Sequence, residues 1–234
     1  MVEYVVKTDD DGKRIEAFKD GSVFEQDLLL EPVYARVKIF FQLANNYLRE
    51  MDLHTDKNEK RAFGMQSFLM SLIGLEAFGN CYFHIRAVQK GVPEASALIA
   101  KRTSLRPKLT DLIELIGDGP LVEQQLLLAE LEKLFDKRNE IAHPKWTLSR
   151  LTLKNQKDET YLTVNHVGEN PNEYFESFDK CKAAQLWCLL FVLRVAELRK
   201  LANPTGFLYQ WTGSTDSSID SVLADLSNLG SGQV

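Results

Sequence analysis

The sequence has little cysteine, no excess of positive charge and no long uninterrupted apolar run. Its three cysteines among 234 residues are an odd number, which excludes a fully paired disulfide framework and favours free thiols in a reducing compartment, so we expect a cytoplasmic protein. The formal net charge of -5 excludes a whole-molecule field that attracts polyanions, so any contact with nucleic acid must depend on a local patch. The longest apolar stretch, SFLMSLIGLEAFGNCYF, is interrupted by Ser, Gly, Glu and Asn, and we expect no membrane span.

The motifs that identify many cofactor and metal sites are missing from the sequence as well. It contains no phosphate-binding glycine loop, no Cys-x2-Cys pair and no zinc-protease helix. Cys181 and Cys188 lie on one face of a predicted helix, a position more typical of core thiols than of metal ligands. His166 has no ligand partner near it in the sequence, and Trp211 is most simply a packing residue. We therefore expect no cofactor and no metal.

Hydrophobic periodicity is the strongest positive signal. From about Glu31 onward, apolar residues recur at spacings of three and four, which is typical of amphipathic helices. The pattern predicts an all-α fold, an up-and-down bundle of five to six helices. After the helix that begins at about Glu31, the predicted helices extend over about 60–89, 93–101, 107–116, 121–142 and 174–202.

Two short alternating segments on either side of a polar turn occur twice in the chain. EYVVKT and KRIEAFK enclose DDDG, and RLTLKN and TYLTVNHV enclose QKDE, so both places predict a β-hairpin. We expect an N-terminal hairpin extension at 1–30 and a helical domain at 31–203 with a hairpin insertion at about 148–168. The composition then shifts to Ser, Gly, Asp and Asn, which predicts a flexible tail at 204–234 that could bind a protein partner.

The stretch FDKRNEIAHPKW ends the helix predicted at 121–142 and places a cation on its apolar stripe. The stripe has the spacing four, three, four, three and consists of Leu127, Leu131, Leu134, Arg138 and Ile141. An unpaired guanidinium on such a stripe is costly, so Arg138 must face a carboxylate, a polar cleft or an anionic ligand. A second protomer packed on the same stripe would supply a symmetric copy of these groups.

The segment from Arg138 to His143 resembles the Arg-x4-6-His motif of the HEPN superfamily, the higher eukaryotes and prokaryotes nucleotide-binding domains. Asn139 directly follows the arginine, and Pro144 keeps His143 at or just past the last turn of the helix. The upstream segment SLIGLEAFGN at 71–80 is similar to a helix segment that often precedes the motif in bacterial members. The resemblance covers roughly residues 31–202 and leaves both hairpins and the tail outside it.

The resemblance implies a helical, metal-independent endoribonuclease. In this chain it implies that His143 moves the proton of the attacking ribose 2'-hydroxyl and that Arg138 stabilises the charge on the phosphorane. Asn139 would orient His143 or hold a phosphate oxygen. Active members of the family bring two such motifs together across a symmetric cleft, so the resemblance also implies a homodimer.

Other polar residues near the motif have a functional and a structural interpretation. Lys137 and Lys145, together with Lys133, give this helix end a local positive excess that suits RNA, although cations are also favoured at any solvated helix C-terminus. Glu76 and Asn80 are one helical turn apart, with His84 one turn further. They either line the cleft beside the motif or form the exposed stripe of an otherwise buried helix.

A second arginine and histidine with the same spacing, Arg49 and His54, show how little the spacing itself means. Arg49 is followed by Glu and not by an amide, and His54 enters the polar loop HTDKNEK, so we regard this pair as a coincidence. A toxin subgroup of the family carries a tyrosine two residues after the histidine, where this chain has Lys145. The sequence thus favours a ribonuclease of phage defence or stress response. The alternative is a non-catalytic helical dimerisation or interaction module that binds RNA or a protein.

Overall fold

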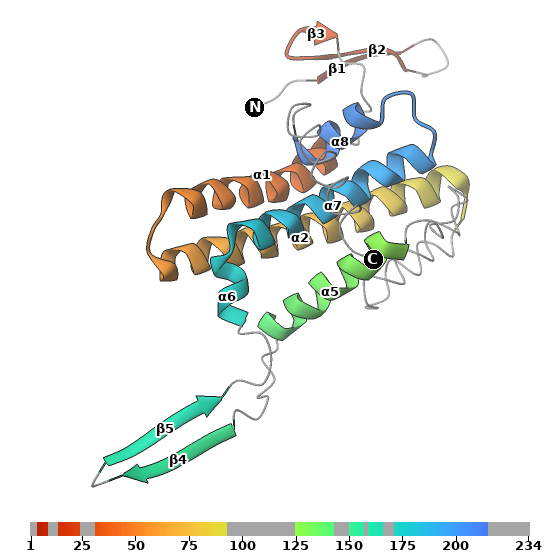
Figure 1. The fold of residues 1–234 in the computed structure, drawn as a ribbon. Helices are drawn as coiled ribbons and strands as arrows, with labels where there is room; N and C mark the ends of the chain where they lie inside the picture. The colour runs from red at the N-terminus through yellow and green to blue at the C-terminus, as the bar shows by residue number, and fades with distance from the viewer. Residues whose placement is uncertain are drawn as a thin grey trace. The chain divides into compact units, whose positions relative to one another are not determined.

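A computed structural model of the chain is mostly helical. It describes residues 4–8, 14–23, 31–92, 125–142, 150–156, 159–165 and 171–214. The described residues form six helices and two small antiparallel sheets (Figure 1), which confirms the predicted all-α fold with hairpins. The chain divides into two compact units, Met1–Arg36 and Val37–Val234.

The first unit contains the predicted N-terminal hairpin. Strand β1 (Tyr4–Thr8) pairs antiparallel with β2 (Arg14–Lys19). A third strand, β3 (Ser22–Val23), was not predicted and pairs with β2 through a turn at Asp20 and Gly21, whose φ angles are 49° and 82°. Positive φ at both central residues is the geometry of a type I' hairpin turn, and Asp-Gly is a sequence that favours it.

The second unit is built around helix α2. Helices are observed at α1 (Glu31–Leu53), α2 (Lys57–Lys90), α5 (Gln125–Ala142), α6 (Pro171–Glu176), α7 (Phe178–Leu198) and α8 (Pro204–Thr212). Helix α2 packs against α5, α6 and α7, and α7 also packs against α8 (Figure 1). Ser67 of α2 donates a hydrogen bond of 2.8 Å to the Ala44 carbonyl of α1. The helices predicted at 93–101 and 107–116 lie outside the described residues.

Two glycines allow neighbouring segments to approach α2 closely. A Cβ atom on Gly64 would lie 2.1 Å from the backbone oxygen of Phe175 in α6, and one on Gly74 would lie 3.0 Å from the ring of Phe41 in α1. By length and composition alone, α2 is the one described helix that could cross a membrane, as many core helices could, and half of its apolar stretch is buried in the fold.

The helix predicted at 174–202 is two helices, so this prediction is wrong in its continuity. Ser177 separates α6 from α7 in an extended conformation, with φ of -89° and ψ of 112°, and its hydroxyl accepts a hydrogen bond from the Lys180 backbone N–H. An N-cap serine satisfies a donor that a helix start leaves unpaired, so the chain can turn here at little cost. Helix α7 then continues into the core with Cys181, Cys188 and Phe191 fully buried.

The flexible tail predicted from residue 204 is wrong for residues 204–214. Pro204 is in the first turn of α8, Asn203 caps that helix through the Gly206 N–H, and Gly213 ends it with a φ of 72°. Trp211 and Leu208 are each 1% exposed. Their burial outweighs the polar composition of the following residues because two large apolar groups on one helical face stabilise the packed state. Residues 215–234 lie outside the described residues.

The predicted hairpin insertion is confirmed. Strand β4 (Arg150–Gln156) pairs antiparallel with β5 (Glu159–Asn165), in a register that joins Gln156 to Glu159 and Arg150 to Asn165. The hairpin follows α5 in the chain and precedes α6, as the pattern of alternating residues predicts.

Candidate functional site

Arg138 of α5 forms an ion pair with Glu76 of α2. Its Nη2 donates to Glu76 Oε2 at 3.3 Å, and the two side chains are 35% and 36% exposed. The structure thus supplies the carboxylate that the position of Arg138 on an apolar stripe requires. The pair also brings the segment at 71–80 into contact with the Arg-x4-His segment, although the two residues are 62 positions apart.

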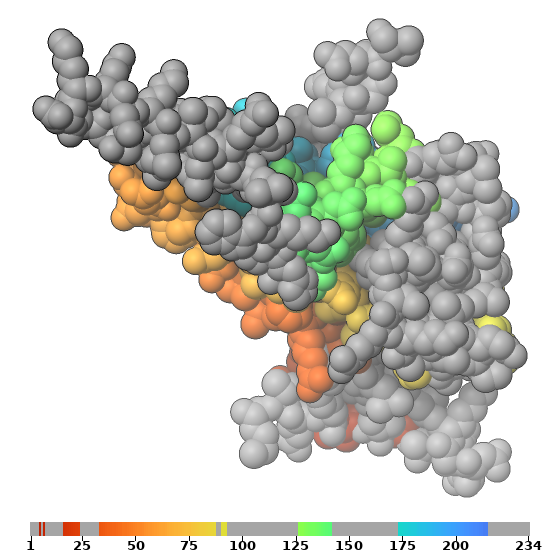
Figure 2. Space-filling model, turned by 90° about the horizontal axis from the view of Figure 1, so that it is seen from below, coloured from red at the N-terminus to blue at the C-terminus, as the bar shows by residue number. Residues whose placement is uncertain are grey.

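The leucine stripe beside Arg138 faces the protein's own core. Leu127, Leu131 and Leu134 are 3%, 2% and 7% exposed, and α5 packs against α2 and α7. These leucines are therefore not the surface on which a second protomer would dock. Figure 2 shows α5 (green) at the surface of the molecule. Leu126 is the one large apolar side chain among the described residues of α5 that is mostly exposed, at 60%.

Among the described residues, Arg138 contacts a carboxylate through one nitrogen, that of Glu76. Arginine carries five N–H donors in a planar fork, and one nitrogen contacts the carboxylate. A half-exposed pair of this kind contributes at most about 1 kcal/mol to stability. Glu76 therefore orients Arg138 more than it stabilises the fold, and the remaining donors can bind the oxygens of a phosphate.

The other predicted site residues are only partly brought together. Asn80 is half-buried on α2, Asn139 is exposed on α5 and His84 is exposed near the end of α2. His143 and Lys145 lie outside the described residues. Among the described candidates, the structure joins Arg138 to Glu76 in one contact and places Asn139 next to Arg138 on the same helix.

Tyr174 of α6 is a site residue that sequence reasoning missed. The Lys137 ammonium lies 4.3 Å from its ring centroid, and the Lys180 ammonium lies 5.7 Å from it. The ring also makes an edge contact with Phe68, with centroids 5.7 Å apart. Lys137 directly precedes Arg138, so an aromatic ring held by the core lies beside the basic end of α5. No sequence signal could have found Tyr174, because the contact depends on the break at Ser177.

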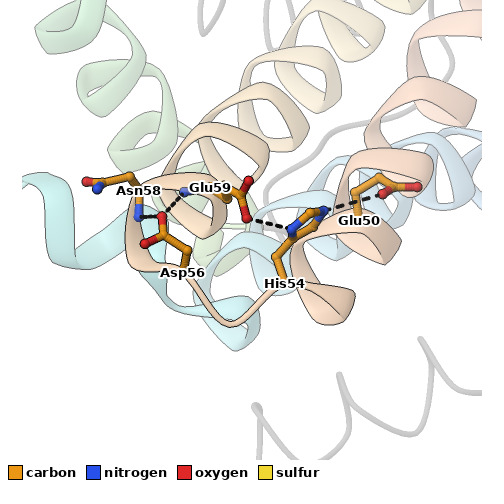
Figure 3. A network of polar contacts seen from close by, with 5 residues as sticks. All are labelled: Glu50, His54, Asp56, Asn58 and Glu59. Carbon is orange, nitrogen blue, oxygen red and sulfur yellow. Dashed lines mark hydrogen bonds and ion pairs between the residues drawn. The ribbon is translucent and has the colours of Figure 1, made fainter.

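The coincidental pair Arg49 and His54 has different surroundings. His54 lies at the corner between α1 and α2, where its Nδ1 is 2.7 Å from Glu59 and its Nε2 is 3.8 Å from Glu50 (Figure 3). The Asp56 carboxylate accepts hydrogen bonds from the Asn58 and Glu59 backbone N–H groups (Figure 3). His54 thus joins two helix ends, which is a structural role.

The buried cysteines have the chemistry of core thiols. Burial raises the pKa of the Cys181 thiol to about 12, and burial raises the pKa of Cys188 as well. A thiol that stays protonated at neutral pH is a poor nucleophile and a poor metal ligand. Within the described part of the chain, no group of three or more His, Cys, Asp or Glu side chains could hold a metal ion.

Comparison with family models, with curated proteins and with solved structures found no match for this chain.

Proposed function

We propose that the protein is a cytoplasmic, metal-independent endoribonuclease of the HEPN type, acting in phage defence or stress response, with Arg138 and His143 as its catalytic residues. The observation that supports this proposal is the ion pair between Arg138 and Glu76. It links the two segments that carry the resemblance, the Arg-x4-His segment on α5 and SLIGLEAFGN on α2. Two segments that resemble one family and also touch each other support a common site more strongly than either segment does singly.

In the proposed reaction, the ribose 2'-hydroxyl attacks the adjacent phosphate. His143 accepts the proton of the hydroxyl, for which an imidazole with an ordinary pKa of about 6.5 is suited. The bond to the 5'-oxygen breaks, the leaving oxygen takes up a proton from the solvent, and the products are a 2',3'-cyclic phosphate and a 5'-hydroxyl. Arg138 stabilises the charge on the phosphorane oxygens with the donors that Glu76 does not engage. Asn139 orients His143 or holds a phosphate oxygen.

The proposed RNA path runs from Arg138 toward Lys137 and Tyr174. The Lys137 ammonium over the Tyr174 ring combines a cation for the phosphate with a flat apolar surface for a base, the two elements that single-strand binding uses. Asn80, one turn along α2 from Glu76, and Lys145 belong to the same proposed surface. A homodimer would bring a second copy of the motif to this surface through the outer face of α5, and sedimentation of a monomer at micromolar concentration would exclude it.

A non-catalytic helical interaction module is the second candidate, and the same ion pair favours it. Glu76 already balances the charge of Arg138, so the fold is satisfied without a phosphate ligand. In that case the basic end of α5 binds RNA or a protein partner and cleaves nothing.

Incubation of the purified protein with total RNA in excess EDTA distinguishes the two candidates. The ribonuclease should cleave RNA without a metal, leave 2',3'-cyclic phosphate ends and leave DNA intact, because DNA lacks the attacking hydroxyl. His143→Ala should abolish cleavage while the thermal unfolding curve stays unchanged. Absence of cleavage by the wild-type protein, with RNA still bound, would favour the interaction module.

A further inference from the structure

Tyr174 is the aromatic ring of the proposed RNA surface, and the core fixes its position. The half-buried ring makes edge-to-face contacts with Phe68 and Phe175, with centroids 5.7 Å and 5.1 Å away. Phe175 is 3% exposed, and its backbone oxygen lies against Gly64 of α2. The Tyr174 hydroxyl donates a hydrogen bond of 3.4 Å to the Lys180 carbonyl. A ring held on these sides cannot move far without disturbing close-packed neighbours.

A lysine over a tyrosine ring does not by itself indicate a ligand. Such pairs are common in proteins, and this chain has a second one, with the Lys38 ammonium 4.8 Å from the ring centroid of Tyr209 on α8. The neighbours of the two lysines differ. Lys38 stands between two apolar residues in the sequence, whereas Lys137 directly precedes Arg138. The pair at Tyr174 therefore joins an aromatic ring to the arginine that is proposed to bind phosphate.

The ring and the guanidinium lie at a fixed step from each other. Consecutive residues of a helix have Cα atoms about 3.8 Å apart and differ by about 100° around the axis. Lys137 accordingly reaches α6, with its ammonium 4.3 Å from the Tyr174 centroid, and Arg138 reaches Glu76 of α2 at 3.3 Å. Helix α2 packs against both α5 and α6. Helix packing therefore sets the separation of the ring from the guanidinium.

A base can replace the lysine on this ring. A base that stacks on the face now covered by the Lys137 ammonium has to displace it. A stacked base is held more strongly than an exposed ammonium over the same ring, and the flexible stem of a lysine lets its ammonium move to a neighbouring phosphate. In double-stranded RNA the bases stack on one another, so an unpaired base is the one that can make this contact.

We propose that Tyr174 selects the position of cleavage by stacking an unpaired base, which brings the phosphate a fixed number of nucleotides away to Arg138. This inference rests on the proposed ribonuclease activity. The substrate is then RNA with an unpaired base at one fixed position relative to the cut. A purine is favoured over a pyrimidine there, because its larger ring system stacks more strongly. Tyr174 determines specificity and takes no part in proton transfer.

Binding of a 2'-O-methyladenosine octamer tests the stacking. The probe has bases and phosphates but no attacking hydroxyl, so the result does not depend on activity. Tyr174→Leu should weaken binding by at least about tenfold, and Tyr174→Phe, which keeps the ring, by less than about threefold. Tyr209→Leu, the matched control, should leave binding within about twofold. The same octamer without bases should bind the wild type at least about tenfold more weakly, a comparison that needs no variant.

Two results of the binding measurement overturn the proposal. The first is a wild-type protein that binds the octamer no better than the octamer without bases, or that binds neither at about 1 mM. The second is a folded Tyr174→Leu variant that binds as tightly as the wild type.

Sequencing of the ends that the protein cuts in a random single-stranded RNA pool tests the selection. Wild-type cuts should show purines enriched at least about twofold at one fixed position. Tyr174→Leu should remove this enrichment, and Tyr209→Leu should keep it. Enrichment that persists in Tyr174→Leu overturns the selection and leaves the ribonuclease intact. If the wild type binds the octamer but cleaves no RNA, the ribonuclease fails and the selection with it, whereas the stacking contact stands.

Discussion

Two segments of the chain carry an arginine five positions before a histidine, and the structure gives their surroundings different chemistry. At the corner between α1 and α2, His54 is placed between Glu50 and Glu59, and Arg49 makes no ion pair within the described residues. At the end of α5, Arg138 is half-buried and contacts Glu76 on another helix.

The difference teaches that spacing within one segment does not define a site. Residues five positions apart are about 140° separated around a helix axis, so the spacing by itself brings no arginine and histidine together. What distinguishes Arg138 is the approach of a second helix, which fixes the guanidinium while leaving donors for a ligand. The corner at His54 is held by glutamates, and a cluster rich in acidic groups repels a phosphate.

The largest expected effect is a loss of stability. It compares the packing of α2 against α6 with the packing of α2 against α1. Gly64→Ala should lower the free energy of unfolding by about 3 kcal/mol, because the added Cβ clashes with the backbone of α6, the helix that carries Tyr174. No side-chain movement can relieve a clash with backbone. Gly74→Ala acts on the α1 side and meets a ring that can move, so it should stay within about 1 kcal/mol, helped by the helix propensity of alanine. Urea unfolding measures both, and equal losses would contradict the contrast.

The next largest expected difference is in RNA cleavage, between substitutions in the two Arg-x4-His pairs. His143→Ala and Arg138→Ala should each lower RNA cleavage by at least about a hundredfold, or about 2.7 kcal/mol of barrier. His54→Ala should leave cleavage within about threefold.

Arg194→Ala is the matched control for Arg138→Ala. Arg194 also pairs with a glutamate, Glu197. These two side chains are 36% and 37% exposed, nearly the same as the side chains of Arg138 and Glu76. Its loss should leave cleavage within about threefold. A similar loss of activity in Arg194→Ala would indicate a general effect on folding, and activity retained in His143→Ala would remove the assigned base.

The acidic partners of the two regions provide a smaller contrast. Glu76→Gln should lower cleavage by about tenfold, or about 1.4 kcal/mol, because Arg138 loses its orienting charge. Glu59→Gln at the corner should leave cleavage unchanged. Both substitutions should change the free energy of unfolding by less than about 1 kcal/mol, since both pairs are partly exposed. If Glu76→Gln raised cleavage, the carboxylate would be competing with the substrate for Arg138.

The smallest expected effect concerns RNA affinity. Lys137→Met should weaken binding of single-stranded RNA about threefold and reduce the slope of log K against log salt by about 0.7, the contribution of one phosphate contact. Lys57→Met, in the first turn of α2 beside the corner, should change neither. Filter binding at several salt concentrations measures both variants, and identical slopes would place the RNA elsewhere.

Sequence patterns predicted much of the fold because they report local preferences. The alternating residues around DDDG and QKDE correctly predicted both hairpins, and the spacing of apolar residues located α1, α2 and α5. The pattern did not reveal the break at Ser177, because apolar residues continue at helical spacing on both sides of it. It also assigned residues 204–214 to a tail, because composition does not show that Trp211 packs into the core.

The sequence by itself determined which residue types are available at the end of α5 and that Arg138, on an apolar stripe, needed a carboxylate, a polar cleft or an anionic ligand. It did not determine the identity of that partner. Only the tertiary structure selected Glu76 and turned the leucines toward the core. The physical reason is that periodicity specifies the face of a helix on which a side chain lies, whereas the packing of helices far apart in the chain decides what that face meets.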